Sequence, residues 1–94
     1  MTVGYPFAHM DSTRFAKAEL LQSDNAEVLA AWAHAVLVEE IDPVDPQKKF
    51  PGLNVQCGDE VKRASVGDYV IKHDDGTFDV RSALTFARDY VRTR

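Results

Sequence analysis

The segment of residues 63–80, "RASVGDYVIKHDDGTFDV", constrains the fold more than any other part of the chain. In it, Asp75-Gly76 separates two runs of alternating apolar and polar residues, which is the strongest short-range signal for a β-hairpin. Gly accepts positive φ freely and Asp tolerates it, so the pair suits a two-residue turn. A two-residue loop predicts that His73 lies opposite Phe78.

This register divides the hairpin into a buried face and an exposed face. The predicted buried face holds Tyr69, Ile71, His73, Phe78 and Val80. On the other face, Lys72 is expected to lie opposite Asp79 as a cross-strand ion pair. We expect His73 to stack on Phe78 at the rim, because no second histidine or cysteine is placed to complete a metal site.

Hydrophobic patterns predict four more elements. Alternation over residues 14–21 predicts a strand, and residues 53–57 and 60–64 predict a second hairpin around Gly58-Asp59. Helical spacing predicts a helix over about residues 25–38, packed on the sheet through Trp32 and capped by Ser23 or by an Asp24–Glu27 capping box. Ser82 is expected to cap a C-terminal helix whose apolar face includes Leu84.

Together these elements predict one α+β domain over residues 1–94. It would contain a small antiparallel sheet of about four to five strands, one packed helix and a C-terminal helix. Residues 1–13 are interpreted as an extended lead-in, and residues 42–52 as a Pro-rich loop.

Charge and composition argue against several classes of protein. The net charge of −4 disfavours general binding to nucleic acid, although residues 61–94 carry a local net charge of +2. The sequence shows neither an apolar run of membrane-spanning length nor a signal peptide, so we expect no membrane partner. The single cysteine, Cys57, excludes an internal disulfide and suits a cytoplasmic location.

No catalytic constellation can be assembled from the sequence. It offers no nucleophile paired with a base, no pair of carboxylates with separated environments, and no cluster of metal ligands. Cys57 is interpreted as a small apolar residue rather than a catalytic thiol. We therefore predict a protein that is not an enzyme and that uses no cofactor or metal.

From about Arg14 to Tyr90, the order of motifs resembles small phage and prophage proteins related to the PGDYG-type domain. The matching positions are Asn25-Ala26-Glu27, Trp32, Arg63-Ala64-Ser65-Val66-Gly67-Asp68-Tyr69, Gly76 and Phe78. The chain departs from the named motif at Val66, where the motif has proline, and at Val70, where it has a second glycine. The resemblance implies a cytoplasmic protein of phage or mobile-element origin, and it implies no reaction and no site residues.

Two functions remain open. The first is a non-catalytic accessory protein of a phage or prophage that binds a host protein. The alternative is a small-ligand binder, such as a sponge for a nucleotide signal that counters host antiviral defence. Its candidate ligand-binding residues would be Arg63, Lys72, Arg81, Arg88 and Arg92 for phosphates, with Tyr69 or Tyr90 for a base.

The pattern of strand edges also predicts self-association. Lys17 and Glu19 would protect residues 14–21 as an edge strand, whereas residues 53–57 carry only neutral polar side chains between apolar ones. We expect this second strand to pair with another chain, which gives a homodimer or a larger symmetric assembly.

Overall fold

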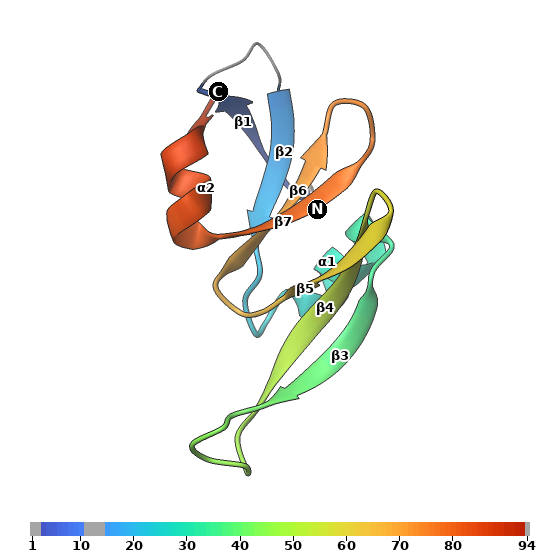
Figure 1. The fold of residues 1–94 in the computed structure, drawn as a ribbon, viewed down its shortest axis with the longest axis vertical. Helices are drawn as coiled ribbons and strands as arrows, with labels where there is room; N and C mark the ends of the chain where they lie inside the picture. The colour runs from blue at the N-terminus through green and yellow to red at the C-terminus, as the bar shows by residue number, and fades with distance from the viewer. Residues whose placement is uncertain (1–2, 11–14, 94) are drawn as a thin grey trace.

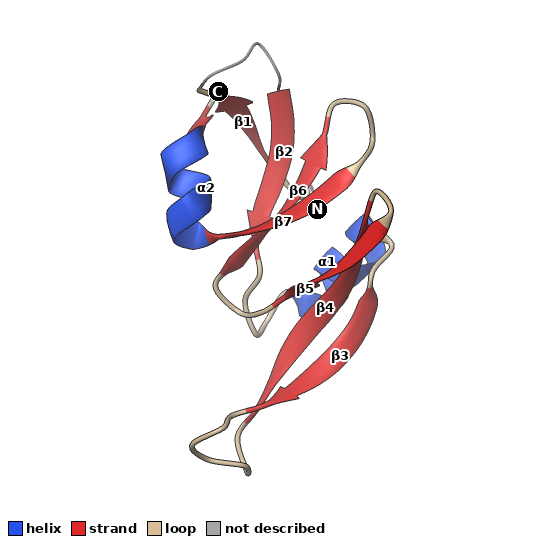
Figure 2. Ribbon diagram, viewed as in Figure 1, coloured by secondary structure: helices blue, strands red, loops and turns tan. Residues whose placement is uncertain are grey.

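The computed structural model describes residues 3–10 and 15–93. Within these residues the chain forms two antiparallel sheets and two short helices, which confirms the predicted α+β class (Figure 1, Figure 2). The five-stranded sheet has the order β7 (Phe78–Ser82), β6 (Asp68–His73), β2 (Phe15–Leu20), β1 (Tyr5–His9) and β8 (Tyr90–Arg92). The three-stranded sheet has the order β3 (Val36–Ile41), β4 (Lys49–Cys57) and β5 (Glu60–Ala64). The helices are α1 (Ala26–Ala33) and α2 (Ala83–Asp89).

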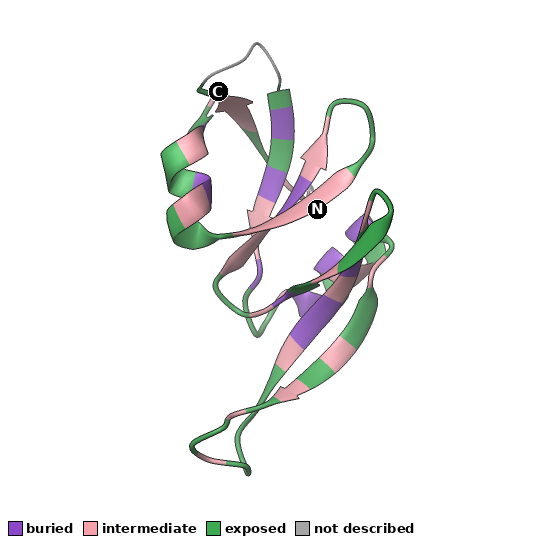
Figure 3. Cartoon of the chain, in the orientation of Figure 1, coloured by how far each residue is buried: buried purple, intermediate pink, exposed green. Residues whose placement is uncertain are grey.

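Both faces of the five-stranded sheet are covered by hydrophobic side chains. On one face, Val70 joins a cluster with α1 and the inner face of the three-stranded sheet, including Leu29 and Leu53. On the other face, Ile71 joins a second cluster with Phe86 of α2. Successive residues of a strand point to opposite faces, so β6 supplies one fully buried side chain to each cluster (Figure 3).

The β6–β7 hairpin forms as predicted, but its register is shifted by one residue. Lys72 lies opposite Phe78 instead of Asp79, because the loop has three residues. The Gly76 N–H donates to the His73 carbonyl, and Gly76 has φ +89°, which is the arrangement of a tight turn followed by a bulge. The predicted Lys72–Asp79 pair is therefore wrong.

The shifted register also separates residues that were predicted to share a face. Tyr69 and Ile71 pack in the cluster beneath α2, whereas Val80 and Phe78 pack against the cluster beneath α1. His73 lies opposite Ala16 of β2 and does not stack on Phe78, which packs edge-on against Trp32. The packing of Trp32 on the sheet is thus confirmed, and the single buried face is wrong.

The predicted helix over residues 25–38 is too long. Helix α1 ends at Ala33, and His34 adopts the left-handed conformation that closes it. After Ala35, Val36–Ile41 form β3, which pairs with β4 along its whole length, and the β-branched Val36, Val38 and Ile41 favour the extended backbone. Neither predicted cap, Ser23 or the Asp24–Glu27 capping box, forms: the N-cap is Asn25, whose side chain accepts from Gln22 N and donates to Leu20 O.

The predicted loop over residues 42–52 is shorter than expected. Only residues 42–48 connect the strands, and β4 already begins at Lys49. Pro51 is tolerated in β4 because β5 pairs with this strand only from Leu53 onward. We call residues 36–52 the arm: from Val38 to Gly52 it is a two-stranded ribbon, and it extends away from the five-stranded sheet (Figure 1).

The remaining predictions divide between confirmed and corrected ones. The strand near residues 14–21, the second hairpin and the helix capped by Ser82 are confirmed. Leu84 was expected on the apolar face of that helix, but it is 85% exposed, and Phe86 is buried instead. The predicted lead-in contains β1, and its parts at residues 1–2 and 11–13 lie outside the described residues. Both predicted edge strands are central in their sheets, so the reasoning behind a dimer through residues 53–57 is wrong.

Candidate functional site

The structure does not bring the predicted phosphate-binding residues together. Arg63 lies on β5 and donates to Asn54 of the neighbouring β4 and to Glu40 of β3, one strand further across the sheet. Arg81 lies on β7 and pairs with Asp89 of α2 at 2.7 Å. Each of these guanidinium groups has a carboxylate partner within the fold, which gives it a structural role.

The other predicted residues at the C-terminal end are also engaged. Arg88 is largely exposed and approaches Asp89 at 3.6 Å, while Arg92 stacks over the ring of Tyr5. Tyr69 and Tyr90 sandwich Phe86, with ring centres 4.1 and 4.8 Å from that ring. These tyrosines form part of the core beneath α2, so they are not free to stack on a base.

Lys72 is the exception among the predicted ligand residues. It lies directly opposite Lys17 across the β2–β6 pair, on the face of the sheet that carries α1. Its Nζ atom lies 5.9 Å from the centre of the Phe78 ring. Lys72 therefore remains available to a ligand, in a setting that the sequence did not predict.

The residues considered for catalysis have structural roles. Burial raises the pKa of the Cys57 thiol, and the Asp79 carboxylate adds to this effect, so the thiol is protonated at neutral pH. Asp68 accepts a hydrogen bond from Ser65 N and stabilises the corner at Gly67. Within residues 3–10 and 15–93, no group of three or more His, Cys, Asp and Glu side chains could hold a metal ion.

An ion pair connects the edges of the two sheets. Lys62 Nζ of β5 lies 2.7 Å from Asp79 Oδ1 of β7. Burial raises the pKa of Asp79, but the Lys62 ammonium, the Val80 N–H and Arg81 outweigh burial, so the net pKa is lowered. The same hydrogen bond raises the pKa of Lys62. This pair holds β7 beside β5.

The arm exposes more large apolar side chains than a ribbon of this length needs for folding. Along its two strands and its turn, the exposed apolar residues are Val36, Leu37, Ile41, Val44 and Phe50. Their exposure ranges from 40% at Phe50 to 91% at Val44. Figure 3 shows the distal part of the arm in the colours of exposed and half-buried residues. Side chains of this kind, gathered on one projection, are typical of a surface that contacts another protein.

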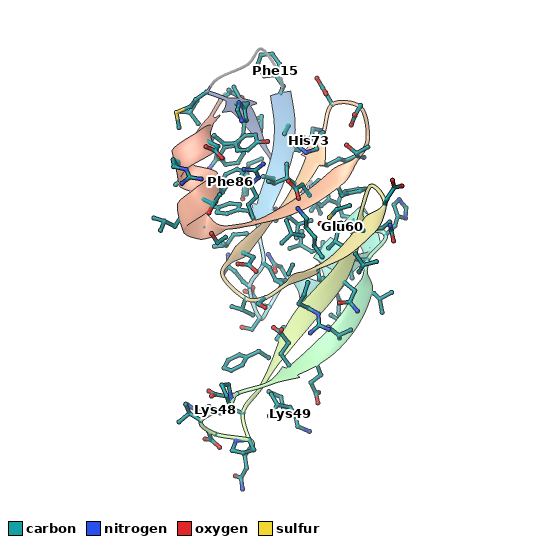
Figure 4. All side chains as sticks on the ribbon, in the orientation of Figure 1. Phe15, Lys48, Lys49, Glu60, His73 and Phe86 are labelled. Carbon is teal, nitrogen blue, oxygen red and sulfur yellow. The ribbon has the colours of Figure 1, made fainter. Side chains whose placement is uncertain are left out.

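Acidic side chains surround these apolar residues. The arm carries Glu39, Glu40, Asp42 and Asp45, and Asp24 and Glu27 lie beside its base at the start of α1. Glu40 is satisfied within the fold by Arg63 and Ser65. Lys48 and Lys49 lie near the distal turn, where Figure 4 labels them, and Lys49 pairs with Glu39. The surface of the arm and the adjoining end of α1 is therefore acidic as well as apolar.

A groove connects the arm to α1. Leu37 and Pro51 of the arm line one side, and Ser23, Asp24 and Val28 line the other. The groove lies at the base of the arm and has a volume of about 350 Å³. It extends the apolar surface of the arm onto the helix, so a partner could contact both elements at once.

The sequence predicted a Pro-rich loop over residues 42–52 and did not predict the arm. The signal was present in Val36, Val38 and Ile41, whose β-branched side chains favour a strand over the end of a helix. No signal in the sequence indicated that Lys17 lies opposite Lys72, because these residues are distant in sequence.

No family model matches the chain, and no solved structure matches it. The resemblance to the PGDYG-type family therefore stays a prediction. Within the described part of the chain, no helix is both long and apolar enough to cross a membrane.

Proposed function

We propose that this chain is a non-catalytic binding protein whose arm docks on another protein. The observation that carries the proposal is the concentration of exposed apolar side chains, above all Ile41, Val44 and Phe50, on a ribbon that extends from the body. A ribbon whose outer strand has only one neighbour can also pair its free backbone edge with a strand of the partner.

The charge of the arm indicates the chemistry of the partner. Carboxylates around an apolar surface favour a partner segment that combines basic and apolar side chains. Under the resemblance to phage and prophage proteins, this partner is a protein of the host cytoplasm. The distal turn supports contact with little reorganisation, since Asp42 accepts hydrogen bonds from Val44 N and Asp45 N.

A comparison of two matched variants tests the proposal. The double variant Ile41→Ser/Val44→Ser removes apolar area from the arm, and the double variant Val61→Ser/Leu84→Ser removes exposed apolar area elsewhere. Affinity capture from host lysate, followed by purification of the captured protein, gives a partner whose affinity is then measured. We expect the arm variant to weaken binding at least tenfold and the control to retain it.

Two outcomes contradict the proposal. The first is a purified partner that binds the arm variant as tightly as the original chain. The second is capture that yields no protein above background from any lysate of the host. Light scattering of the chain alone distinguishes a third case, in which the arm contacts a second copy and the arm variant converts an oligomer into a monomer.

A further inference from the structure

A row of side chains crosses four strands on the face of the sheet that carries α1. Pro6, Lys17, Lys72 and Phe78 lie directly opposite one another, one from each of β1, β2, β6 and β7. Two lysines are thus neighbours in the middle of the row. Like charges placed opposite each other in a sheet destabilise it, so this pair carries a cost that folding does not explain.

The two lysines have no carboxylate partner to offset this repulsion. Within the described part of the chain, neither ammonium group lies within 4.0 Å of a carboxylate oxygen. Glu19, the acidic residue two positions along β2 on the same face, accepts a hydrogen bond from Gly4 N instead. The pair therefore presents two adjacent positive charges to whatever enters the space above them.

That space is a groove of about 350 Å³ with aromatic walls. Its floor is formed by Lys17 and Lys72, and Phe15 and Trp32 contribute aromatic surface. His73 and Asp74 also line the groove and add polar groups to it. A pocket of this size, with mostly apolar walls and a few polar groups, is typical of a small-molecule site.

The packing around Trp32 holds its ring beside the lysines. Its ring lies edge-on to Phe78, with the ring centres 5.9 Å apart. A Cβ atom at Gly4 would lie 2.9 Å from Trp32 Cζ2 and 3.2 Å from Lys17 Cβ, so only glycine allows this close approach. The backbone at Gly4, just before β1, thus lies against both the indole and the stem of Lys17, which places the aromatic surface and the charge at one site.

We infer that this groove binds a small aromatic phosphate of mononucleotide size. The two ammonium groups supply charge-assisted hydrogen bonds to one phosphate, and the indole supplies a surface on which a planar ring can stack. The site lies at the opposite end of the molecule from the tip of the arm: Figure 4 labels Phe15 and His73 at one end and Lys48 and Lys49 at the other. Binding here is independent of the docking function of the arm.

The test uses the single tryptophan as its reporter. AMP is titrated into the full chain, and Trp32 fluorescence is excited where adenine does not absorb. We expect AMP to quench the emission with a dissociation constant of about 1 mM or below. Adenosine and inorganic phosphate, which each supply half of the ligand, are expected to bind at least tenfold more weakly.

Variants assign the effect to the lysines. Lys17→Ala and Lys72→Ala are each expected to weaken AMP binding about tenfold, and the distant Lys48→Ala is expected to leave it unchanged. Lys17→Glu gives the clearest result: it should abolish AMP binding while leaving the melting temperature equal or higher, because it replaces a like-charge pair by an opposite-charge pair. Substitution of a residue that is needed only for folding would lower both AMP binding and the melting temperature.

Several outcomes overturn the inference. Wild-type protein that shows no quenching with AMP, and no chemical-shift change at the Trp32 indole N–H, has no such site. If adenosine binds as tightly as AMP, the lysines do not contribute to binding. If inorganic phosphate binds as tightly as AMP, the aromatic surface does not contribute. If the Lys17→Ala or the Lys72→Ala variant binds AMP with wild-type affinity, AMP binds at another site.

Discussion

Replacing Asp79 by asparagine should weaken the attachment of β7 to β5. The carboxylate is only 16% exposed and lies 2.7 Å from Lys62 Nζ, so the substitution removes a charge-assisted hydrogen bond while keeping the side-chain shape. Such a bond contributes about 1.5–3 kcal/mol when fully protected from water. Because Lys62 is 39% exposed, solvent screening reduces this value, and we expect a loss of about 1 kcal/mol.

The pH dependence identifies the cause of this loss. The pKa of Asp79 is lowered in the folded chain from its ordinary value of 3.8, so its contribution is fully present above that value. The contribution disappears as the pH falls through the lower folded pKa, because the protonated acid then resembles asparagine. The two proteins should therefore differ in the free energy of unfolding at neutral pH and converge once the pH is below the lowered folded pKa of Asp79.

Urea unfolding followed by circular dichroism measures both quantities. At neutral pH, the D79N protein should unfold at lower urea concentration with an unchanged dependence on urea, which indicates a change in stability alone. The exposed Asp59 in the β4–β5 turn provides a control, and D59N should match the wild type at every pH. If D79N lost the same free energy at neutral and acidic pH, asparagine would simply fit poorly and the ion-pair argument would be refuted.

Three further substitutions test the packing and the turns. Gly76→Ala should destabilise the chain by about 1–2 kcal/mol, because the residue has φ +89°, and a thermal melt that matches the wild type would contradict this. Leu53→Ala should cost about 2–5 kcal/mol in urea unfolding, since the side chain is fully buried, whereas Val61→Ala on the same hairpin should change stability by about 0.5 kcal/mol or less. Ser82→Ala should lower stability by about 1 kcal/mol, because the Ser82 hydroxyl accepts a hydrogen bond from Thr85 N at the start of α2, and an unchanged melting temperature would show that this cap is dispensable.

The hairpins could be predicted from sequence because their signals are local. Asp75-Gly76 and the flanking alternation identify strands whatever the rest of the chain does. The register could not be predicted in the same way. A two-residue loop and a three-residue loop both use Gly76 at positive φ, so the sequence is compatible with either. In the three-residue loop that forms, Phe78 packs against Trp32.

The end of α1 and the existence of the arm could not be predicted, because both depend on contacts that the sequence does not reveal. Val36 continues the helical spacing of the apolar residues before it, and only its pairing with Asn54 of β4 makes it part of a strand. The arm projects because β5 ends its pairing at Leu53, which is a property of two segments considered together. The candidate groove likewise requires Lys17 and Lys72 to meet across a pair of strands that are far apart along the chain.

The double burial of β6 has a consequence for how the chain opens. Val70 and Ile71 belong to different hydrophobic clusters, so neither cluster can separate from the sheet without exposing its side of the same strand. Backbone amides of β6 should therefore exchange their hydrogens with solvent only through global unfolding. Amides of β3, the outer strand of the arm, should exchange through local fraying, at rates that do not depend on the free energy of global unfolding. Exchange measured residue by residue would then show a slowly exchanging centre and a rapidly exchanging extremity within one small chain.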